Sequence, residues 1–429
     1  MSENMKNSPK LRFPEFVNDK EWEEKTLGKC LLKHPDYGVN AAAVPFSKNL
    51  PTYLRITDIS VDGYYLNNEK VSVNIDATSD NYLEEGDIVL ARTGASVGKS
   101  YKYRKEDGAL VFAGFLIRVK PDKTKLNSDL LFHFLSTEKY WKWVNVVSAR
   151  SGQPGINGNE YANLPIPIPS TLNEQQKIAD CLSSVDYLIS AQSQKVELLK
   201  EHKKALMQQL FPQDGEEVPK LRFPEFKNAP KWEEKFIEDF FAVGSSKRVL
   251  QEEWTSQGVP FYRTRELVSL SKNEPFGSEI FISEELFLEL SKKYGIPSAG
   301  DFLVSGVGTL GICYQVQNND KFYFKDGNVI WFKLVQKLNS NYFKYCFQSD
   351  HIQNQIFAQS SASTVGTYTI QNAKKTKFWY PPTFQEQQKI ADCLISVDEQ
   401  ITSQNQKLQT LKEHKKALMQ QLFPSKEAQ

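Results

Sequence analysis

The sequence is poor in cysteine and has no long apolar run. It contains five cysteines in 429 residues, an odd number, and no two of them have C-x-x-C spacing. This pattern indicates free thiols in a reducing compartment rather than a disulfide framework or a zinc site. No apolar run approaches the roughly 20 residues that a membrane helix needs, and the first ten residues lack the apolar core of a signal peptide. We therefore expect a cytoplasmic protein without a membrane partner.

An excess of charge of either sign is also missing. Lysine and arginine total 53 and aspartate and glutamate total 52, so the net charge is +1. A non-specific polyelectrolyte binder is usually strongly basic. Any binding of nucleic acid by this chain must therefore use local patches or be shared with a partner. The apolar fraction of 40% and aromatic fraction of 12% are typical of folded domains.

The chain does contain long internal repeats. "LKEHKKALMQQLFP" occurs at 199–212 and 411–424, "EQQKIADCL" at 174–182 and 386–394, and "PKLRFPEF" at 9–16 and 219–226. Both copies of "PKLRFPEF" are followed by "WEEK", and a weaker "LNS" echo begins at Leu126 and Leu338. The chain is a tandem duplication of units of roughly 210 residues, too long a period for a solenoid. The middles, 40–170 and 245–382, share pattern more than letters. We expect the identical parts to do one job twice and the divergent parts to do two different jobs.

Each unit ends in a segment that predicts a long helix. Thr171-x-x-Glu174 and Thr383-x-x-Glu386 are capping-box signatures after proline-rich runs, and Pro212 and Pro424 follow the helical pattern. Apolar residues recur at alternating spacings of three and four, interrupted by Gln192 and Lys203 in the first arm and their counterparts in the second. The apolar seam consists of Ile178, Leu182, Val185, Ile189, Val196, Leu199, Leu206, Leu210, Ile390, Leu394, Val397, Ile401, Leu408, Leu411, Leu418 and Leu422.

A heptad seam of this length is typical of a coiled coil. We expect the two arms, 171–212 and 383–424, to pair with each other in antiparallel orientation, with the polar seam positions fixing the register. The alternative is that each helix packs only on its own lobe.

Short β-rich runs dominate the middle of each unit. They occur at 52–59, 86–91 and 108–120 in the first unit and at 260–267, 300–306, 311–316 and 328–335 in the second. One helix per lobe is predicted after them, at 128–144 and 340–357. The predicted fold class is α+β: two tandem domains with curled, mixed, β-rich sheets, each followed by a long helix.

Catalytic motifs are not convincing in either lobe. "GASVGKS" at 94–100 lacks the first glycine of a phosphate-binding loop, because position 93 is Thr93. "GVGTLG" at 306–311 is followed by a strand pattern where a dinucleotide-binding fold requires a helix. Both runs predict glycine-rich turns between strands. "YPPT" at 380–383 lacks the Asp or Asn that precedes the prolines in the DPPY/NPPF site of amino-methyltransferases, and no histidine has metal-ligand spacing. We predict a non-catalytic chain.

Polar and cationic residues on predicted loops are the candidates for DNA contact, because such side chains bind phosphates and read base edges. For any single residue, a solvated loop position is the simpler explanation. The candidates are Arg55, Thr57, Arg92, Thr93, Lys99, Arg150, Ser151, Gln153, Asn157, Arg263, Arg265, Ser305, Thr309, Ser360, Ser363, Thr364 and Thr367.

The two diverged lobes, the helices that begin with "EQQKIAD" and the "PKLRFPEF…WEEK" lead-in together resemble a type I restriction–modification specificity subunit over essentially the whole chain. The resemblance implies two target recognition domains, each reading one half of a split, asymmetric site on double-stranded DNA. It implies that the helical regions hold two modification subunits, which methylate adenine N6, and set the gap between half-sites. It also implies restriction subunits with motor and nuclease activity.

The resemblance further implies that this chain binds no cofactor, and that the partners use S-adenosylmethionine, ATP and Mg. The expected domains are target recognition domain 1 (1–170), helix 1 (171–212), a linker and lead-in (213–230), target recognition domain 2 (231–382), helix 2 (383–424) and a tail (425–429). A structural adaptor that binds protein or glycan is the alternative from another class. A fragment of a fused methyltransferase–nuclease is a third, but the chain has no spare length for catalytic domains.

Overall fold

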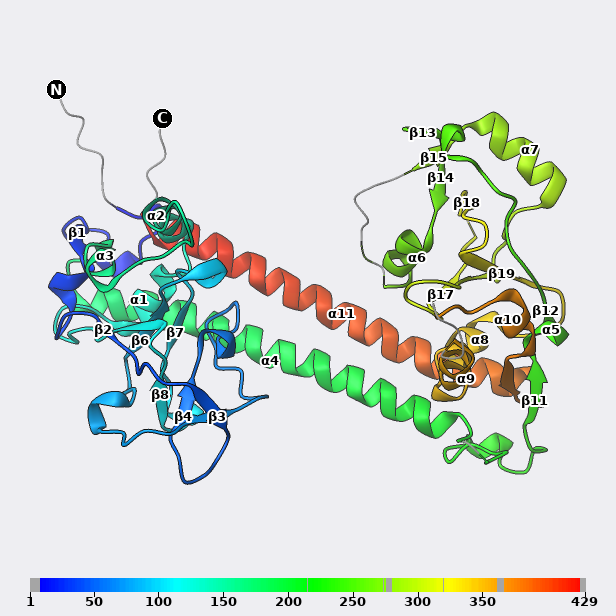
Figure 1. Ribbon diagram of the computed structural model, residues 1–429, viewed down its shortest axis with the longest axis horizontal. Coiled ribbons are helices and arrows are strands. Elements are labelled where there is room, and N and C mark those ends of the chain that lie inside the picture. The colour runs from blue at the N-terminus through cyan, green and yellow to red at the C-terminus, as the bar shows by residue number, and fades with distance from the viewer. Residues whose placement is uncertain are drawn as a thin grey trace. The chain divides into compact units, whose positions relative to one another are not determined.

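The structure, a computed structural model, describes residues 8–213, 215–272, 274, 280–318, 320–360 and 366–424. Its contacts divide the chain into two compact units (Figure 1). Unit 1 contains Met1–Gln194 and Gln406–Gln429, and unit 2 contains Lys195–Asn405. Each unit therefore contains one lobe, the beginning of one long helix and the end of the other. The candidates Ser363 and Thr364 lie outside the described residues.

The two long helices have the predicted positions. α4 (Leu172–Leu210) and α11 (Phe384–Leu422) are 39 residues each. Thr171 caps α4 by accepting the Glu174 backbone N–H at 3.3 Å, and Thr383 caps α11 in the same way at 3.2 Å. Only this half of the predicted capping box forms. The Glu174 carboxylate binds other partners instead, because it is buried against the lead-in segment.

The predicted seam is the covered face of both helices. Every seam position among the described residues is buried or half-buried, whereas Leu188 and Leu198, which lie off the seam, are 51% and 65% exposed. In unit 1 the Lys415 Nζ lies 2.6 Å from Asp186 Oδ1, and in unit 2 Lys203 Nζ lies 2.7 Å from Asp398 Oδ1. Within each unit, the first half of one long helix therefore contacts the second half of the other, as in two antiparallel helices.

Lobe 1 contains two four-stranded sheets and a two-stranded ribbon. The first sheet has the order β2 (Asp36–Tyr37), β9 (Leu116–Val119), β6 (Ile88–Ala91), β7 (Ser100–Lys102), and the second has the order β3 (Ala43–Pro45), β5 (Val71–Val73), β4 (Thr52–Leu54), β8 (Leu110–Phe112). β1 (Glu23–Thr26) pairs with β10 (Pro165–Ile168). The β4–β8 pair is parallel and the other pairs of these sheets are antiparallel.

Lobe 2 repeats this topology strand for strand. Its sheets have the orders β12 (Phe241–Gly244), β19 (Val329–Leu334), β16 (Phe302–Ser305), β17 (Cys313–Gln315) and β13 (Trp254–Thr255), β15 (Phe281–Ile282), β14 (Val259–Tyr262), β18 (Tyr323–Phe324). β11 (Glu233–Phe236) pairs with β20 (Lys377–Tyr380), and β14–β18 is the parallel pair. The predicted α+β class and its duplication are confirmed.

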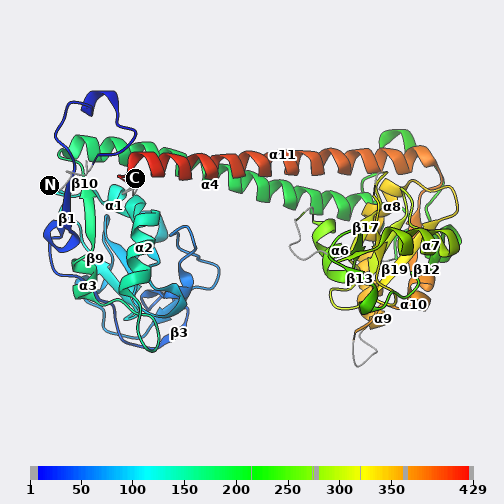
Figure 2. The same ribbon diagram turned by 90° about the horizontal axis from the view of Figure 1, so that it is seen from above.

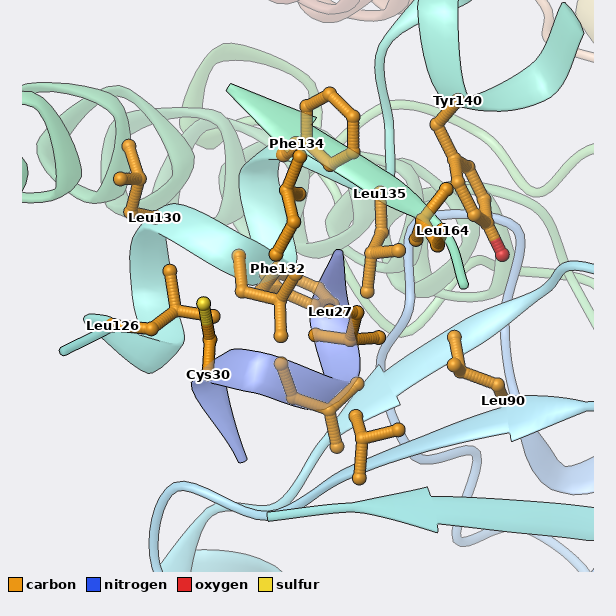
Figure 3. Close-up of a cluster of buried hydrophobic side chains, with 14 of the residues drawn as sticks. Leu27, Cys30, Leu90, Leu126, Leu130, Phe132, Phe134, Leu135, Tyr140 and Leu164 are labelled. Atoms are coloured by element: carbon orange, nitrogen blue, oxygen red, sulfur yellow. The ribbon is translucent and has the colours of Figure 1, made fainter. Parts of the chain in front are cut away.

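Alternating side chains place the first sheet of each lobe between two apolar layers. In lobe 1, Ile88 and Leu90 point into the cluster formed with the helices, and Val89 and Ala91 point into a cluster shared with the second sheet. Figure 3 shows the first of these clusters, where Leu90 lies below Phe134, Leu135 and other helical side chains. The sheet therefore fixes the loops at its ends relative to the long helix.

The single lobe helix that the sequence predicted is two helices in each lobe. Lobe 1 has α1 (Ser128–Phe134) and α2 (Glu138–Val147), both visible in Figure 2, and lobe 2 has α8 (Ser340–Phe347) and α9 (Asp350–Ser360). The break occurs where a hydroxyl binds the preceding turn: Thr137 Oγ1 donates to the Phe134 carbonyl at 2.7 Å, and Ser349 Oγ donates to the Cys346 carbonyl at 2.6 Å. Thr137 then caps α2, so the chain starts a new helix.

Short helices complete the lobes. Lobe 1 has α3 (Gly158–Ala162), and lobe 2 has α5 (Ile237–Phe240), α6 (Thr264–Ser271), α7 (Glu284–Tyr294) and α10 (Ile370–Lys375). The strand predicted at 52–59 ends at Leu54 and the one predicted at 260–267 ends at Tyr262, because Arg55 and Arg263 there begin helical turns closed by Asp58 and Glu266.

A buried carboxylate joins the lead-in segment to the beginning of α4. Glu174 is fully buried and accepts hydrogen bonds from Arg12 Nε at 2.7 Å, Arg12 Nη2 at 2.8 Å and Trp22 Nε1 at 3.1 Å. In unit 2, Glu386 accepts the same three bonds from the arginine and tryptophan of the second lead-in, at 2.7, 2.9 and 3.0 Å. Charge-assisted bonds offset the cost of burying this charge.

The "LNS" echo belongs to the same network. The Asn127 backbone N–H donates to Gln175 Oε1 at 2.9 Å, and its Nδ2 donates to Gln176 Oε1 at 2.7 Å. In unit 2 the equivalent asparagine makes both bonds, at 3.0 and 2.7 Å. The two glutamines after the buried glutamate therefore hold the beginning of the lobe helix against the long helix.

The end of the opposite long helix closes this network, which we call the joint. In unit 1 the joint combines residues 9–22, Asn127, residues 174–176 and residues 421–424: Leu11 N donates to the Gln421 carbonyl at 3.0 Å, and Phe423 packs edge-on against Trp22 at 6.3 Å. In unit 2, Phe211 packs in the same way at 6.4 Å. The two copies of each identical stretch thus make the same contacts, one copy in each joint. This shared role accounts for the identity of their sequences.

Candidate nucleic-acid interface

The candidates at the end of lobe 1 gather where the turn after β6 meets the loop at 148–157. Gly94 N donates to the Pro154 carbonyl and Ile156 N donates to the Arg92 carbonyl, both at 2.9 Å, and Thr93 forms a β-bridge with Gly155. This places Arg92, Thr93 and the exposed Gln153 on one surface. We call this surface tip 1; it consists of Tyr37, residues 92–94, 114–115 and 148–157.

Arg92 is held in position within tip 1. Its guanidinium lies over the Tyr37 ring, 5.0 Å from the ring centre, and its Nη1 donates to the Gly114 carbonyl at 3.4 Å. The Tyr37 hydroxyl accepts the Gly158 N–H at 3.0 Å, which fixes the ring. A cation held over an aromatic ring loses little freedom when it binds a ligand. Arg92 is therefore preorganised to donate outward.

Two aromatic residues of tip 1 were missed at the sequence level. Tyr37 is 47% exposed and Phe115 is 61% exposed, and the Arg92 N–H donates to the Phe115 carbonyl at 3.1 Å. Only polar and cationic residues were considered as candidates for DNA contact, and both of these side chains are aromatic. Phe115 lies in the short link between β8 and β9, inside a run that the sequence predicted as continuous, so its exposure became visible only in the structure.

Other lobe 1 candidates are partly engaged in internal contacts. Arg150 donates to the Val147 carbonyl at 2.7 Å and forms an ion pair with Glu160. Asn157 caps α3, and Lys99 Nζ donates to the Ile59 carbonyl at 3.0 Å. Lys99 thus stabilises the lobe. Ser151 is exposed in the 148–157 loop and belongs to tip 1.

The strand-end arginines of both lobes form local ion pairs rather than lying free. Arg55 Nη2 lies 2.7 Å from Asp58 Oδ1, and Arg263 Nη2 lies 2.6 Å from Glu266 Oε1. The hydrogen bond to Asp58 raises the pKa of Arg55. Burial acts to raise the pKa of Glu266, but the hydrogen bonds from Arg263 outweigh it and the pKa is lowered.

Both arginine side chains keep some exposure, 32% for Arg55 and 28% for Arg263, so a ligand can still reach them. Thr57 Oγ1 lies 3.4 Å from Asp58 Oδ1, and Arg265 Nη2 lies 3.2 Å from Glu266 Oε1 with a side chain that is 61% exposed.

Lobe 2 has an equivalent surface, but it is formed by different side chains. Tip 2 consists of Ser245, residues 306–311, 327–328 and 366–371; Tyr368 N donates to the Gly306 carbonyl at 2.9 Å, as Ile156 N does to Arg92 in lobe 1. Gly306 occupies the place of Arg92. A cavity of about 360 Å³ lies here, lined in part by Ser245, Gly306 and Thr367. Tip 1 therefore presents an arginine where tip 2 is hollow.

Three lobe 2 candidates differ in their access to a ligand. Thr309 is exposed in the glycine turn. Ser305 is fully buried, and its hydroxyl donates to the Thr309 carbonyl at 2.5 Å. Ser360 is 5% exposed and donates to the Phe357 carbonyl at 2.8 Å. Burial leaves Ser305 and Ser360 no surface for a direct contact with DNA.

The glycine-rich runs are turns between strands, as predicted. Residues 94–96 form a 3₁₀ turn between β6 and β7, and residues 306–311 connect β16 to β17. Gly94 and Gly308 have φ of 72° and 73°, a conformation that favours glycine. Neither turn begins a helix that could bind a phosphate.

Metal and thiol chemistry find no support in the part of the chain that the structure describes. No three His, Cys, Asp or Glu side chains there are grouped to hold a metal ion. The five cysteines are free, and burial raises the pKa of Cys346 to about 12 and that of Cys313 further. A thiol with a raised pKa is a poor nucleophile. Among the described helices, none is long and apolar enough to cross a membrane.

The comparisons with known proteins agree with this arrangement. The family described as "Type I restriction modification DNA specificity domain" matches residues 44–201 and 230–413, well over half of the chain. The type I restriction enzyme MjaVIII specificity subunit of Methanocaldococcus jannaschii is 24% identical, over 99% of this chain and 96% of that protein.

Solved structures show the same fold. The S subunit of a type I restriction–modification system from M. genitalium aligns with a TM-score of 0.59 at 16% identity, over 98% of this chain and 100% of the other. A chain from a structure on complex assembly and conformational transition of the type I R-M system aligns with a TM-score of 0.54 at 15% identity, over 94% and 98%. The two family matches cover the two lobes and reach into both long helices, and the chain therefore belongs to the type I restriction–modification DNA specificity family, a non-catalytic component of such systems.

Proposed function

We propose that each lobe reads one half of a bipartite, asymmetric site on double-stranded DNA. The observation that carries this proposal is that one strand order occurs twice with different side chains at the same surface. Tip 1 presents Arg92 beside Tyr37 and Phe115, and tip 2 presents a hollow beside Thr367. Different contents on one scaffold suit two different half-sites, because base edges are read by a few side chains while phosphate contacts fix the position.

In this proposal the joints and long helices are the constant part. Two identical joints suit two identical modification subunits, which methylate adenine N6 with S-adenosylmethionine. α4 and α11 pair along their seams as an antiparallel coiled coil and set the spacing between half-sites. Restriction subunits that use ATP and Mg complete the assembly. Support comes from the seam burial and from the antiparallel order of contacts within each unit.

The test is to express the chain with its cognate modification subunit and to map adenine methylation across the host genome by single-molecule sequencing. We expect one split, asymmetric motif methylated on both strands. Arg92→Ala should relax one base position in one half only, because a bidentate arginine–guanine contact is worth about 1–3 kcal/mol. Thr367→Ala is the matched change in the other lobe and should affect the other half only.

Relaxation of both halves by Arg92→Ala would contradict independent reading by the lobes. No new methylation with a folded, bound modification subunit would contradict the proposal as a whole and favour the adaptor hypothesis.

A further inference from the structure

A large cavity lies beside the joint of unit 1 and shares Lys10, Gln421, Phe423 and Pro424 with it. It has a volume of about 1080 Å³ and lies where α2 and the 62–64 segment of lobe 1 face α4 and the last turns of α11. Lysines line it from three segments: Lys10 in the lead-in, Lys139 and Lys142 on α2, and Lys412, Lys415 and Lys416 on α11. We call this cavity the basic corner.

Three of these lysines have no partner among the described residues of the lobe and helices. Lys139 pairs with Glu24 at 3.0 Å and Lys415 pairs with Asp186 at 2.6 Å. Lys142, Lys412 and Lys416 are exposed and make no hydrogen bond or ion pair with any of the described residues. Unpaired ammonium groups on two facing walls attract an anionic ligand that can reach both walls.

The rest of the lining favours a protein segment over a nucleic-acid backbone. Ile189, Met419 and Phe423 give the corner apolar surface, and Asp62 and Glu138 give it carboxylates. A phosphodiester backbone gains nothing from this apolar surface, whereas the carboxylates repel phosphates and acidic side chains alike and do not distinguish the two ligands. An amphipathic peptide buries apolar side chains on the floor and places its own acidic groups at the lysines.

One wall of the corner has a sequence that recurs in unit 2, and the other wall does not. Lys412, Lys415, Lys416 and Met419 belong to the duplicated "LKEHKKALMQQLFP" segment, so the same side chains recur at 200–207 in unit 2. The lobe wall differs, because His351 and Asn354 stand where lobe 1 has Lys139 and Lys142. The shared wall suits a partner present twice, and the lobe wall makes the unit 1 site more basic.

We propose that the basic corner binds a short, acidic, amphipathic segment of the modification subunit, and that it binds more tightly than the corresponding surface of unit 2. This inference rests on the proposed function, which places one modification subunit at each joint. It adds an asymmetry: two identical partners bind with unequal affinity, and the lysines on α2 cause the difference.

The test is titration of the purified cognate modification subunit into the wild-type chain and into a Lys142→Glu/Lys416→Glu variant, followed by calorimetry and native mass spectrometry. The wild-type chain should bind two subunits with distinct affinities. The variant should lose about tenfold or more at the tighter site and keep the weaker one. The difference should shrink as salt rises, since exposed charges are screened.

Lys48→Glu/Lys123→Glu is the control, because both lysines are exposed in lobe 1 outside the corner and the change in net charge is the same. Equal thermal unfolding of the variants excludes misfolding. Unchanged affinity at both sites of the charge-reversed chain would overturn the inference, and so would weaker binding of a site-free DNA duplex with unchanged subunit binding. A wild-type chain that binds no modification subunit would instead remove the proposed function, and this inference with it.

Discussion

The joints and the tips have opposite relations between sequence and structure. At the joints, Glu174 and Glu386 accept the same three hydrogen bonds at distances that agree within 0.1 Å, from identical sequences. At the tips, Arg92 and Gly306 occupy equivalent places in identical strand orders, and the neighbouring side chains differ. The joints are alike in both sequence and structure, whereas the tips are alike only in their backbone fold.

The difference follows from the kind of interaction at each place. A buried carboxylate tolerates no change in its donors, because an unpaired buried charge costs several kcal/mol. A surface loop is held by backbone hydrogen bonds, such as Ile156 N to Arg92 O and Tyr368 N to Gly306 O, which form although the residues at the two equivalent positions differ. Duplicated joints therefore stay alike while duplicated tips are free to diverge.

Removing the buried carboxylate should have the largest effect. Glu174→Ala leaves Arg12 and the Trp22 N–H without their shared partner in a buried site, so we expect a loss of about 3–5 kcal/mol in the free energy of unfolding. Glu386→Ala should cost the same within about 1 kcal/mol if the joints are equivalent. Urea denaturation followed by tryptophan fluorescence measures both. Glu197→Ala, at an exposed position on α4, is the control and should be nearly neutral.

Acid should lower the stability of unit 1 more than that of unit 2, because the two units have different residues at an equivalent buried position. His133 is 2% exposed, and burial, followed by the charges of Lys415, Lys102 and Arg104, lowers its pKa to about 3. Its counterpart Tyr345 instead donates to Asp398 at 2.7 Å. The unfolded histidine binds a proton near pH 6.5 and the folded one only near pH 3. Stability is therefore complete above pH 6.5 and falls by about 1.4 kcal/mol per pH unit below it, about 3 kcal/mol by pH 4.

His133→Tyr copies unit 2 and is the matched variant. The difference in unfolding free energy between wild type and variant, measured at pH 7, 5 and 4, should change in favour of the variant as the pH falls. A difference that is constant with pH would show that His133 is not kept neutral by the fold.

The smallest effect is expected at the ion pairs between the long helices. Lys415→Met and Lys203→Met each remove one pair whose lysine is about one-fifth exposed, so solvent screening limits the loss to about 1 kcal/mol. The two variants should differ at acid pH, since Lys415 contributes to the low pKa of His133 and Lys203 faces Tyr345. Thermal unfolding at pH 7 and pH 5 tests this. Equal behaviour of the two variants at pH 5 would argue against that coupling.

Much of the fold could be predicted because its signals are periodic and local. The seam from Ile178 to Leu210 predicted a helix and its covered face, and Thr171 predicted where it begins. The helix at 128–144 was predicted as one element because Thr137, which caps α2, has a polar side chain that either a cap or a helix surface accepts. The capping box failed at Glu174 for a similar reason, since the donors that compete for its carboxylate lie 152 or more residues away.

Where the candidate residues lie could be predicted from the sequence only in part. Arg92, Thr93 and Gln153 gather at tip 1, but Arg55 and Arg263 are engaged by acids three residues later, and Ser305 is buried. Short-range spacing did not reveal these ion pairs as structural. Tyr37 was missed because its role depends on Arg92, 55 residues away in the chain.

The sequence alone determined the duplication, the two long helices, the mixed lobes and the family, because repeats, helical periodicity and caps are properties of neighbouring residues. Only the tertiary structure decided that each joint is completed by the end of the opposite long helix, that tip 1 presents Arg92 while tip 2 has a cavity, and that lysines of α2 and α11 face one cavity. These features depend on contacts between residues far apart in the chain, and such contacts exist only once the chain has folded.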